Sequence, residues 1–134
     1  MKTKERNNIL VQRAFELMND KRSKYRQGIV DNNGFVDKAY ASQISAFSVS
    51  VAMIGLKPTL AMYYDKGGSA VNTHNIVGLI AELLTKDGYA DFSGKAESFF
   101  KHAMSEEDDD TLRMKVIDNA VALKVVIRTF LKSE

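Results

Sequence analysis

Few side chains in this sequence are of the kinds that carry out catalysis. The chain has two histidines, His74 and His102, and no cysteine, which excludes disulfides, thiol catalysis and cysteine-ligated metals. The two histidines lack the short spacing of a helical metal site. No spacing suggests a nucleophile with a neighbouring base. We therefore expect a protein that is not an enzyme and holds no metal or cofactor.

The densest acidic segment is residues 105–110, Ser-Glu-Glu-Asp-Asp-Asp. Consecutive acidic side chains point in different directions, and the spacing of a calcium loop is absent. The segment precedes a predicted helix, where negative charge is stabilised by the helix dipole, and Ser105 with Asp108 has the spacing of a capping box. His102 and Glu106 can also pair one helical turn apart. We interpret the run as a solvated helix start.

A glycine-rich segment, Lys66–Ser69, superficially resembles a phosphate-binding loop. The Walker loop needs its lysine after the glycines, beside Ser or Thr, and a buried strand before it. None of these conditions is met. We interpret the segment as a connector that could still touch a nucleic-acid backbone.

The basic side chains give the strongest functional signal. With 100° per residue, three of them fall nearly on one line of the first predicted helix, and three more form an arc on the last. We expect the two groups to converge on one strip that contacts phosphates. The alternative is a solubilising surface, in which the C-terminal Lys and Arg also offset a helix dipole. The candidate RNA-binding residues are Arg6, Arg13 and Lys24 in the first group and Arg113, Lys124 and Arg128 in the second.

The net charge of +2 conceals a strong polarity along the chain. Residues 1–28 carry eight Lys or Arg against three acids, and residues 111–134 carry five against two. Residues 67–110 carry three Lys or Arg against nine acids. Because both ends are basic, the near-neutral average does not argue against a polyanionic partner.

The length and composition are those of a single globular domain. A chain of 134 residues, with 45% apolar and 27% charged residues, can bury one core. The N-terminus lacks the apolar segment of a signal peptide, so we expect a cytoplasmic protein. Apolar residues recur at three- and four-residue steps, and no segment alternates with period two. The sequence thus predicts an all-α fold, one compact bundle of about six helices over residues 1–134, at about 4–27, 38–54, 58–64, 74–86, 94–104 and 108–132.

Between Lys38 and Asp65 the chain carries a single charge, Lys57. A membrane-spanning helix needs about 20 apolar residues without interruption. Here several serines and the Gly55–Thr59 segment interrupt the stretch, and Gly55 followed by Pro58 is typical of a corner between two helices. We expect no membrane span. The small residues of helix 38–54 predict that other helices or a partner subunit surround it.

Three segments of this region resemble a known family. Tyr40–Ser42, Phe47–Val49 and Gly55–Met62 are similar to the central signature of the small helical subunit of type III-B (Cmr-type) CRISPR effector complexes, and Gln12–Ala14 resembles that family's first helix. The resemblance implies a noncatalytic structural and RNA-contacting subunit for antiviral defence. It implies several copies that self-associate along the complex, beside other subunits, and line the groove where target RNA pairs with guide RNA.

Two other interpretations remain open. The chain could be a helical adaptor that docks a protein through its uncharged face and binds no nucleic acid. It could also be a DNA-binding regulator, because Gly55–Pro58 joins two helices. The DNA-binding interpretation is the weaker one, since only Lys57 and Thr59 could reach bases or phosphates from the second of these helices.

Overall fold

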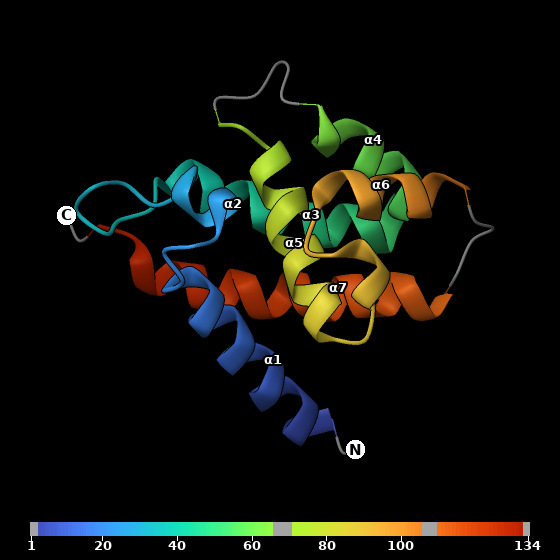
Figure 1. Cartoon of the computed structure of the whole chain (residues 1–134), viewed down its shortest axis with the longest axis horizontal. Coiled ribbons are helices and arrows are strands. Elements are labelled where there is room, and N and C mark those ends of the chain that lie inside the picture. The colour runs from blue at the N-terminus through green and yellow to red at the C-terminus, as the bar shows by residue number, and fades with distance from the viewer. Residues whose placement is uncertain (1–2, 66–70, 106–109, 133–134) are drawn as a thin grey trace.

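The computed structural model describes residues 3–65, 71–105 and 110–132. In these ranges the chain forms α-helices, two short 3-10 helices and no strand longer than an isolated bridge, which confirms the predicted all-α fold (Figure 1). The helices are α1 Thr3–Met18, α2 Lys24–Gln27, α3 Lys38–Ile54, α4 Leu56–Tyr64, α5 His74–Lys86, η1 Ala90–Phe92, α6 Ala96–Ser105, α7 Asp110–Ile127 and η2 Arg128–Phe130.

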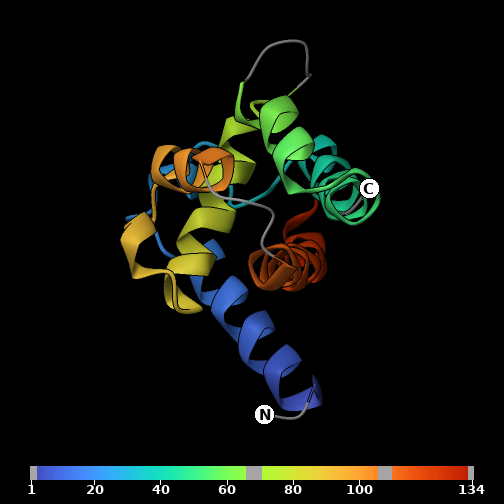
Figure 2. The same ribbon diagram turned by 90° about the vertical axis from the view of Figure 1, so that its right-hand side faces the viewer.

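Helix α5 forms the centre of the fold. Eight of its thirteen residues are buried, and it packs against α1, α2, α4, α6 and α7. Helix α7 lies between α1 and α3, with which it makes extensive contacts. Both views show the N-terminal half of α1 projecting away from the other helices (Figures 1 and 2).

The first predicted helix is broken into two, so the prediction of one helix over residues 4–27 is wrong. The chain turns at Asn19–Ser23, between α1 and α2. The Asp20 carboxylate accepts a hydrogen bond from the backbone N–H of Arg22 at 3.0 Å. The Ser23 hydroxyl accepts one from the backbone N–H of Arg26 at 3.2 Å and caps α2. These short polar side chains offer the backbone an alternative to continuing the helix.

The predicted corner at Gly55 is confirmed, with α4 beginning at Leu56. Gly55 has φ 102° and ψ 166°, a conformation that is essentially restricted to glycine. The Thr59 hydroxyl donates to the Gly55 carbonyl at 2.8 Å and lies 2.7 Å from the Ser50 hydroxyl, which ties α4 back to α3. Within the described ranges no helix has the length and apolar character needed to cross a membrane.

Within the described ranges, other helices cover one side of α3 and leave the other side exposed. Ile44, Phe47 and Val51 are fully buried, whereas Val49 is 54% exposed and Met53 is 78% exposed. The expectation that other helices of the chain surround α3 is therefore wrong for its outer face. Burial by the described parts of the chain therefore does not account for the absence of charge on that face.

The later helices follow the predicted ones with shifted ends. Helix α6 begins at Ala96, and α7 gives way to the 3-10 turn of η2 at Arg128. The connector at Lys66–Ser69 falls on residues 66–70, which lie outside the described ranges. The roles expected of Asp108 as a cap and of Glu106 as a partner of His102 also fall outside them.

Candidate nucleic-acid interface

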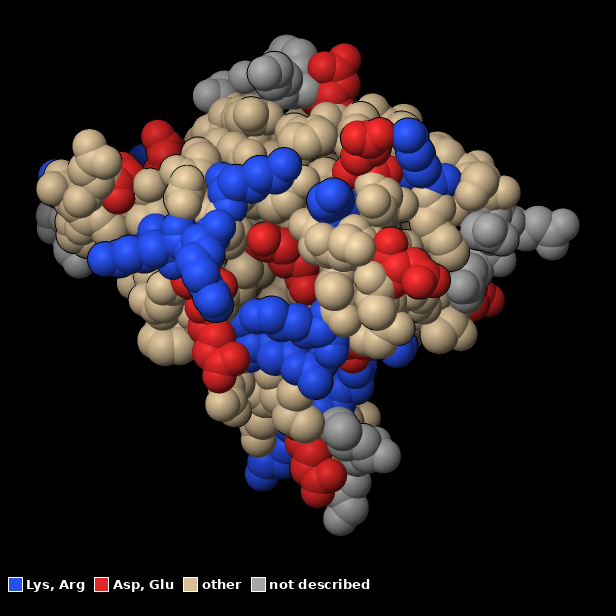
Figure 3. Space-filling model, in the orientation of Figure 1, with Lys and Arg blue, Asp and Glu red and all other residues tan. Residues whose placement is uncertain are grey.

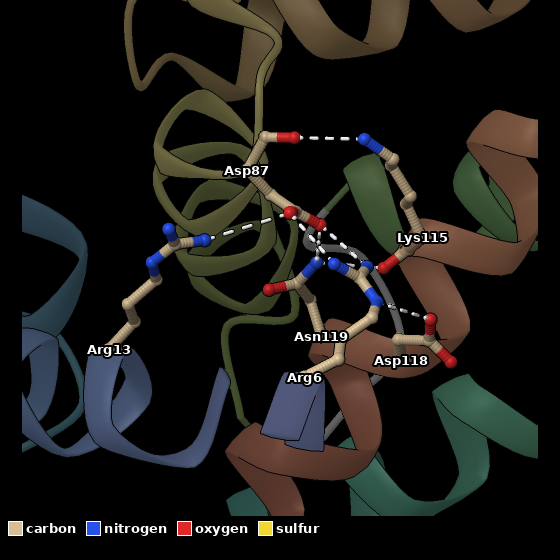
Figure 4. A network of polar contacts seen from close by, with 6 residues as sticks. All are labelled: Arg6, Arg13, Asp87, Lys115, Asp118 and Asn119. Carbon is tan, nitrogen blue, oxygen red and sulfur yellow. Dashed lines mark hydrogen bonds and ion pairs between the residues drawn. The ribbon is translucent and has the colours of Figure 1, made fainter. Parts of the chain in front are cut away.

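A polar network is centred on Asp87, directly after the last residue of α5 (Figure 4). The Asp87 side chain is only 7% exposed, and Arg6 of α1 donates to both of its carboxylate oxygens, at 3.0 and 2.8 Å. The Arg6 Nε also donates to Asp118 of α7 at 3.2 Å. A two-pronged arginine–carboxylate contact is among the strongest polar contacts in proteins.

Two residues of α7 complete the network (Figure 4). The Asn119 side-chain amide donates to Asp87 at 3.1 Å and to the backbone carbonyl of Lys115 at 2.8 Å. The Lys115 ammonium donates to the Asp87 carbonyl at 3.0 Å, where a cation offsets the negative end of the α5 dipole. The network therefore fastens α1, α5 and α7 to one another.

The network keeps Asp87 and Arg6 charged. Burial alone would raise the pKa of Asp87, but the hydrogen bonds from Arg6 and Asn119 outweigh it and hold that pKa below its ordinary value. The hydrogen bond to Asp87 in turn raises the pKa of Arg6. At neutral pH both groups are ionised and paired.

The two candidates on α1, Arg6 and Arg13, differ in how far their guanidinium groups are already paired. Arg6 is committed to Asp87 and Asp118 inside the fold. Arg13 makes one ion pair with Asp87, at 3.6 Å, and a third of its side chain is exposed. This distance is too long for a hydrogen bond, so the Arg13 guanidinium retains donors that a phosphate could accept from.

Lys24 is not on the helix that carries Arg6 and Arg13, so the predicted line of three basic residues on one helix is wrong. It is exposed on α2, and its charge, like that of Lys86, acts on the carboxylate of Glu82. Burial nevertheless raises the pKa of Glu82, and the Ser23 hydroxyl donates to it at 2.7 Å. Lys24 and Lys86 therefore flank one partly buried acid.

We define the basic face as four exposed or half-exposed cations chosen from those near the C-terminal turn of α5 and the turn between α1 and α2. Figure 3 shows Lys and Arg side chains gathered on this side of the molecule, with acidic side chains between them. The sequence analysis did not identify Lys86 as a candidate, although it follows Glu82 by one helical turn. The basic face consists of Arg13, Arg22, Lys24 and Lys86.

The three candidates near the C-terminus lie elsewhere, Arg113 and Lys124 on α7 and Arg128 on η2. With 100° per residue, Lys124 falls about 20° from Arg113 but about 120° from Asp118, the residue that faces α1. Arg113 pairs with Asp110 at 3.5 Å, and Arg128 follows Lys124 by one turn. The two basic groups therefore do not converge on one strip as expected. Exposed apolar side chains of α7 lie between them: Met114, Val121 and Val125.

Both histidines have packing roles in the fold. The Nδ1 atom of His74 lies 2.7 Å from the carbonyl oxygen of Tyr64, and its ring packs edge-on against the Tyr64 ring. His102 packs edge-on against Phe92. Within the three described stretches of chain, no group of three or more His, Asp or Glu side chains could hold a metal ion. The chemistry that the basic face offers is recognition of anions by charge.

Comparison of the chain with models of known families, with curated proteins and with solved structures finds no match in any of the three. The resemblance of the Tyr40 and Gly55 segments to a CRISPR subunit therefore enters the functional argument only as a hypothesis.

Proposed function

We propose that this chain is a noncatalytic, RNA-contacting structural subunit of a type III-B CRISPR ribonucleoprotein. In this proposal several copies line the groove between guide and target RNA. The observation that carries the proposal is the basic face, where Arg13, Arg22, Lys24 and Lys86 surround the end of α5. The choice of this particular complex rests on the resemblance of Tyr40–Ser42 and Gly55–Met62 to segments of its small helical subunit.

The basic face suits contact with phosphates more than with bases. Its cations lie on α1, α2, α5 and the turn between α1 and α2, and long flexible side chains of this kind position a backbone without reading sequence. The acids Asp20 and Glu82 lie among them and weaken the attraction of one copy for RNA. Several copies along one RNA would restore the affinity, because each further contact is then intramolecular.

Arg6 has a different role in this proposal. Its guanidinium is occupied by Asp87 and Asp118, so it positions α1 and with it Arg13. Losing Arg6 would disturb the basic face indirectly, through the fold. For this reason Arg6 is a poor residue with which to test RNA contact.

The proposal is tested by co-purification from cells that carry the whole system. A tagged copy should bring down a large assembly that contains RNA, and a variant with Arg13→Gln and Lys24→Gln should retain less RNA while folding normally. The matched control is Lys57→Gln on α4, which packs on α3, α5 and α6. An RNA-free preparation of the wild-type protein, or equal RNA retention by both variants, would argue against the proposal.

One observation favours the adaptor as a second candidate function. The outer face of α3 is uncharged and exposes Ala46, Val49 and Met53. Such a face suits a protein partner better than a polyanion. Recovery of the tagged chain with other proteins but without RNA would favour the adaptor.

A further inference from the structure

Helices α1 and α7 together form an apolar face. Two hollows of about 370 and 410 Å³ lie between these helices, and Val11 and Val125 line both of them. Large apolar side chains are exposed around the hollows: Phe15 is 54% exposed, Val125 51% and Val121 44%. Contiguous exposed apolar side chains on a folded domain mark sites of interaction. We call the surface around these four side chains the α1–α7 face.

On α1 this face is bordered by four exposed polar side chains that follow one another at four-residue steps. Side chains at this spacing form one ridge along a helix. The charge of the ridge changes from positive at its N-terminal end, through two neutral amides, to negative at its C-terminal end. The ridge consists of Lys4, Asn8, Gln12 and Glu16.

The middle of the ridge belongs to the α1–α7 face, and its two charged ends lack ionic partners within the described ranges. Asn8 and Gln12 line the larger of the two hollows. Glu16 accepts a hydrogen bond from the Gln12 amide at 3.2 Å, but neither Glu16 nor Lys4 forms an ion pair with a described residue. Both charges are therefore available to a partner.

The charges along α7 run in the opposite sense. Asp118 lines the smaller hollow, and the exposed Arg128 follows Val125 by three residues. Asp118 accepts from Arg6, yet its side chain is still 35% exposed. Val121 and Val125 lie between the two charges. This row is therefore negative at its N-terminal end, apolar in its middle and positive at its C-terminal end.

The two rows have their midpoints at the same level of the α1–α7 pair. The α1 ridge has its midpoint at Leu10, and the α7 row has its midpoint at Leu123, next to Ala122. Leu10 and Ala122 line the same hollow, so the two midpoints lie side by side. A two-fold axis that runs across both helices at this level brings the ends of each row against the opposite ends of the same row in a second copy. The facing pairs are Lys4 with Glu16, Asp118 with Arg128, and Val121 with Val125.

We infer that the α1–α7 face binds the same face of a second copy of this chain, in a two-fold dimer. Val11, Val121 and Val125 are covered at the centre of this contact, and pairs of opposite charge lie at its ends. A polyanion fits the face less well, because Glu16 and Asp118 would repel it.

The inference goes beyond the proposed function. A two-fold contact uses the same patch on both copies, so it closes with two copies and cannot generate a row of them. It is therefore separate from the self-association along RNA that the resemblance implies.

Sedimentation equilibrium of the full chain without RNA measures the dimer. The wild type should pass from monomer to dimer as its concentration rises, with no larger species. Lys4→Glu and Glu16→Lys should each raise the Kd of the dimer about ten-fold, because either change turns two attractive contacts into two repulsive ones. Both residues are exposed, and circular dichroism checks that the variants are folded.

A mixture of the two variants makes the test specific. The Lys4→Glu variant carries two acids on its ridge, whereas the Glu16→Lys variant carries two cations, so each ridge complements the other. An equimolar mixture should therefore regain the wild-type Kd. The matched control is Met53→Asp on the outer face of α3, which should leave the Kd unchanged.

Four outcomes would each overturn the inference: a wild type that stays monomeric at its highest soluble concentration, assemblies larger than two copies, loss of the dimer in Met53→Asp, or a mixture that associates no more tightly than its components. None of these variants alters Arg13, Arg22, Lys24 or Lys86, so the proposed RNA contact is tested separately.

Discussion

The guanidinium of Arg6 donates two hydrogen bonds, of 3.0 and 2.8 Å, to the carboxylate of Asp87. The two residues are 81 positions apart in the chain. This contact gives the two arginines of α1 different roles. One of its arginines holds the fold together, and Arg13 beside it keeps part of its guanidinium for other partners. The internal network and the basic face thus share one acid at the end of α5.

Asp87→Ala should lower the free energy of unfolding by about 2–4 kcal/mol, since it leaves Arg6 and Asn119 without their buried acceptor. Urea denaturation followed by circular dichroism measures the change. The control is Glu97→Ala, which breaks the exposed pair with Lys101 and should leave the stability unaltered within error. Equal stability of Asp87→Ala and the wild type would contradict the structural role of the network.

The stability contributed by Asp87 should depend on pH. Its pKa is lowered in the folded state, so the contribution is complete above the unfolded value of about 4 and is lost as the pH falls through the lower folded value. The stability difference between wild type and Asp87→Asn should therefore be largest near pH 7 and shrink below about pH 4. A difference that is constant with pH would show that the charge of Asp87 is unimportant.

Glu82 should show the opposite dependence. Burial raises its pKa in the folded state, so stability is lost as the pH rises through that value. Glu82→Gln removes the charge and keeps an acceptor for the Ser23 hydroxyl, so it should be more stable relative to wild type at pH 7 than at pH 4. Thermal unfolding at the two pH values measures this, with Glu5→Gln on the exposed side of α1 as the control. A relative stability that rises toward low pH would contradict the assignment.

Gly78→Ala should destabilise the fold by about 1–3 kcal/mol, although alanine is the better helix former. A Cβ atom at Gly78 would lie 2.1 Å from the Tyr25 ring, whose hydroxyl accepts from the backbone N–H of Ala96 at 2.9 Å. Gly28→Ala is the matched control, because its Cβ would meet the movable amide end of Asn75. Chemical denaturation of both variants gives the comparison, and equal stabilities would show that Tyr25 can move aside.

The helices with one apolar ridge could be predicted from the sequence, because local periodicity determines them. The Gly55 corner was predicted for the same reason, since it depends on neighbouring residues. The break at Asn19–Ser23 was missed, because the apolar spacing continues through it to Tyr25. The polar contacts of Asp20 and Ser23 outweigh that spacing.

The candidate site was less predictable than the fold. A helical projection shows which basic residues share a flank, but it cannot show that Asp87 lies beside Arg6 in space. It also cannot show that Lys86 of α5 meets Lys24 of α2 around Glu82. Both facts depend on how α1, α2 and α5 pack. That packing brings together residues far apart in the sequence, which local periodicity does not predict.

The central claim is tested most directly by titrating single-stranded RNA at several salt concentrations and comparing wild type with Arg13→Gln plus Lys24→Gln. Each lost phosphate contact should reduce the slope of log Kd against log salt by about 0.7, so two lost contacts reduce it by about 1.4. Lys57→Gln should leave the slope unchanged. A slope that is the same in the double variant and the wild type would show that the basic face does not contact RNA.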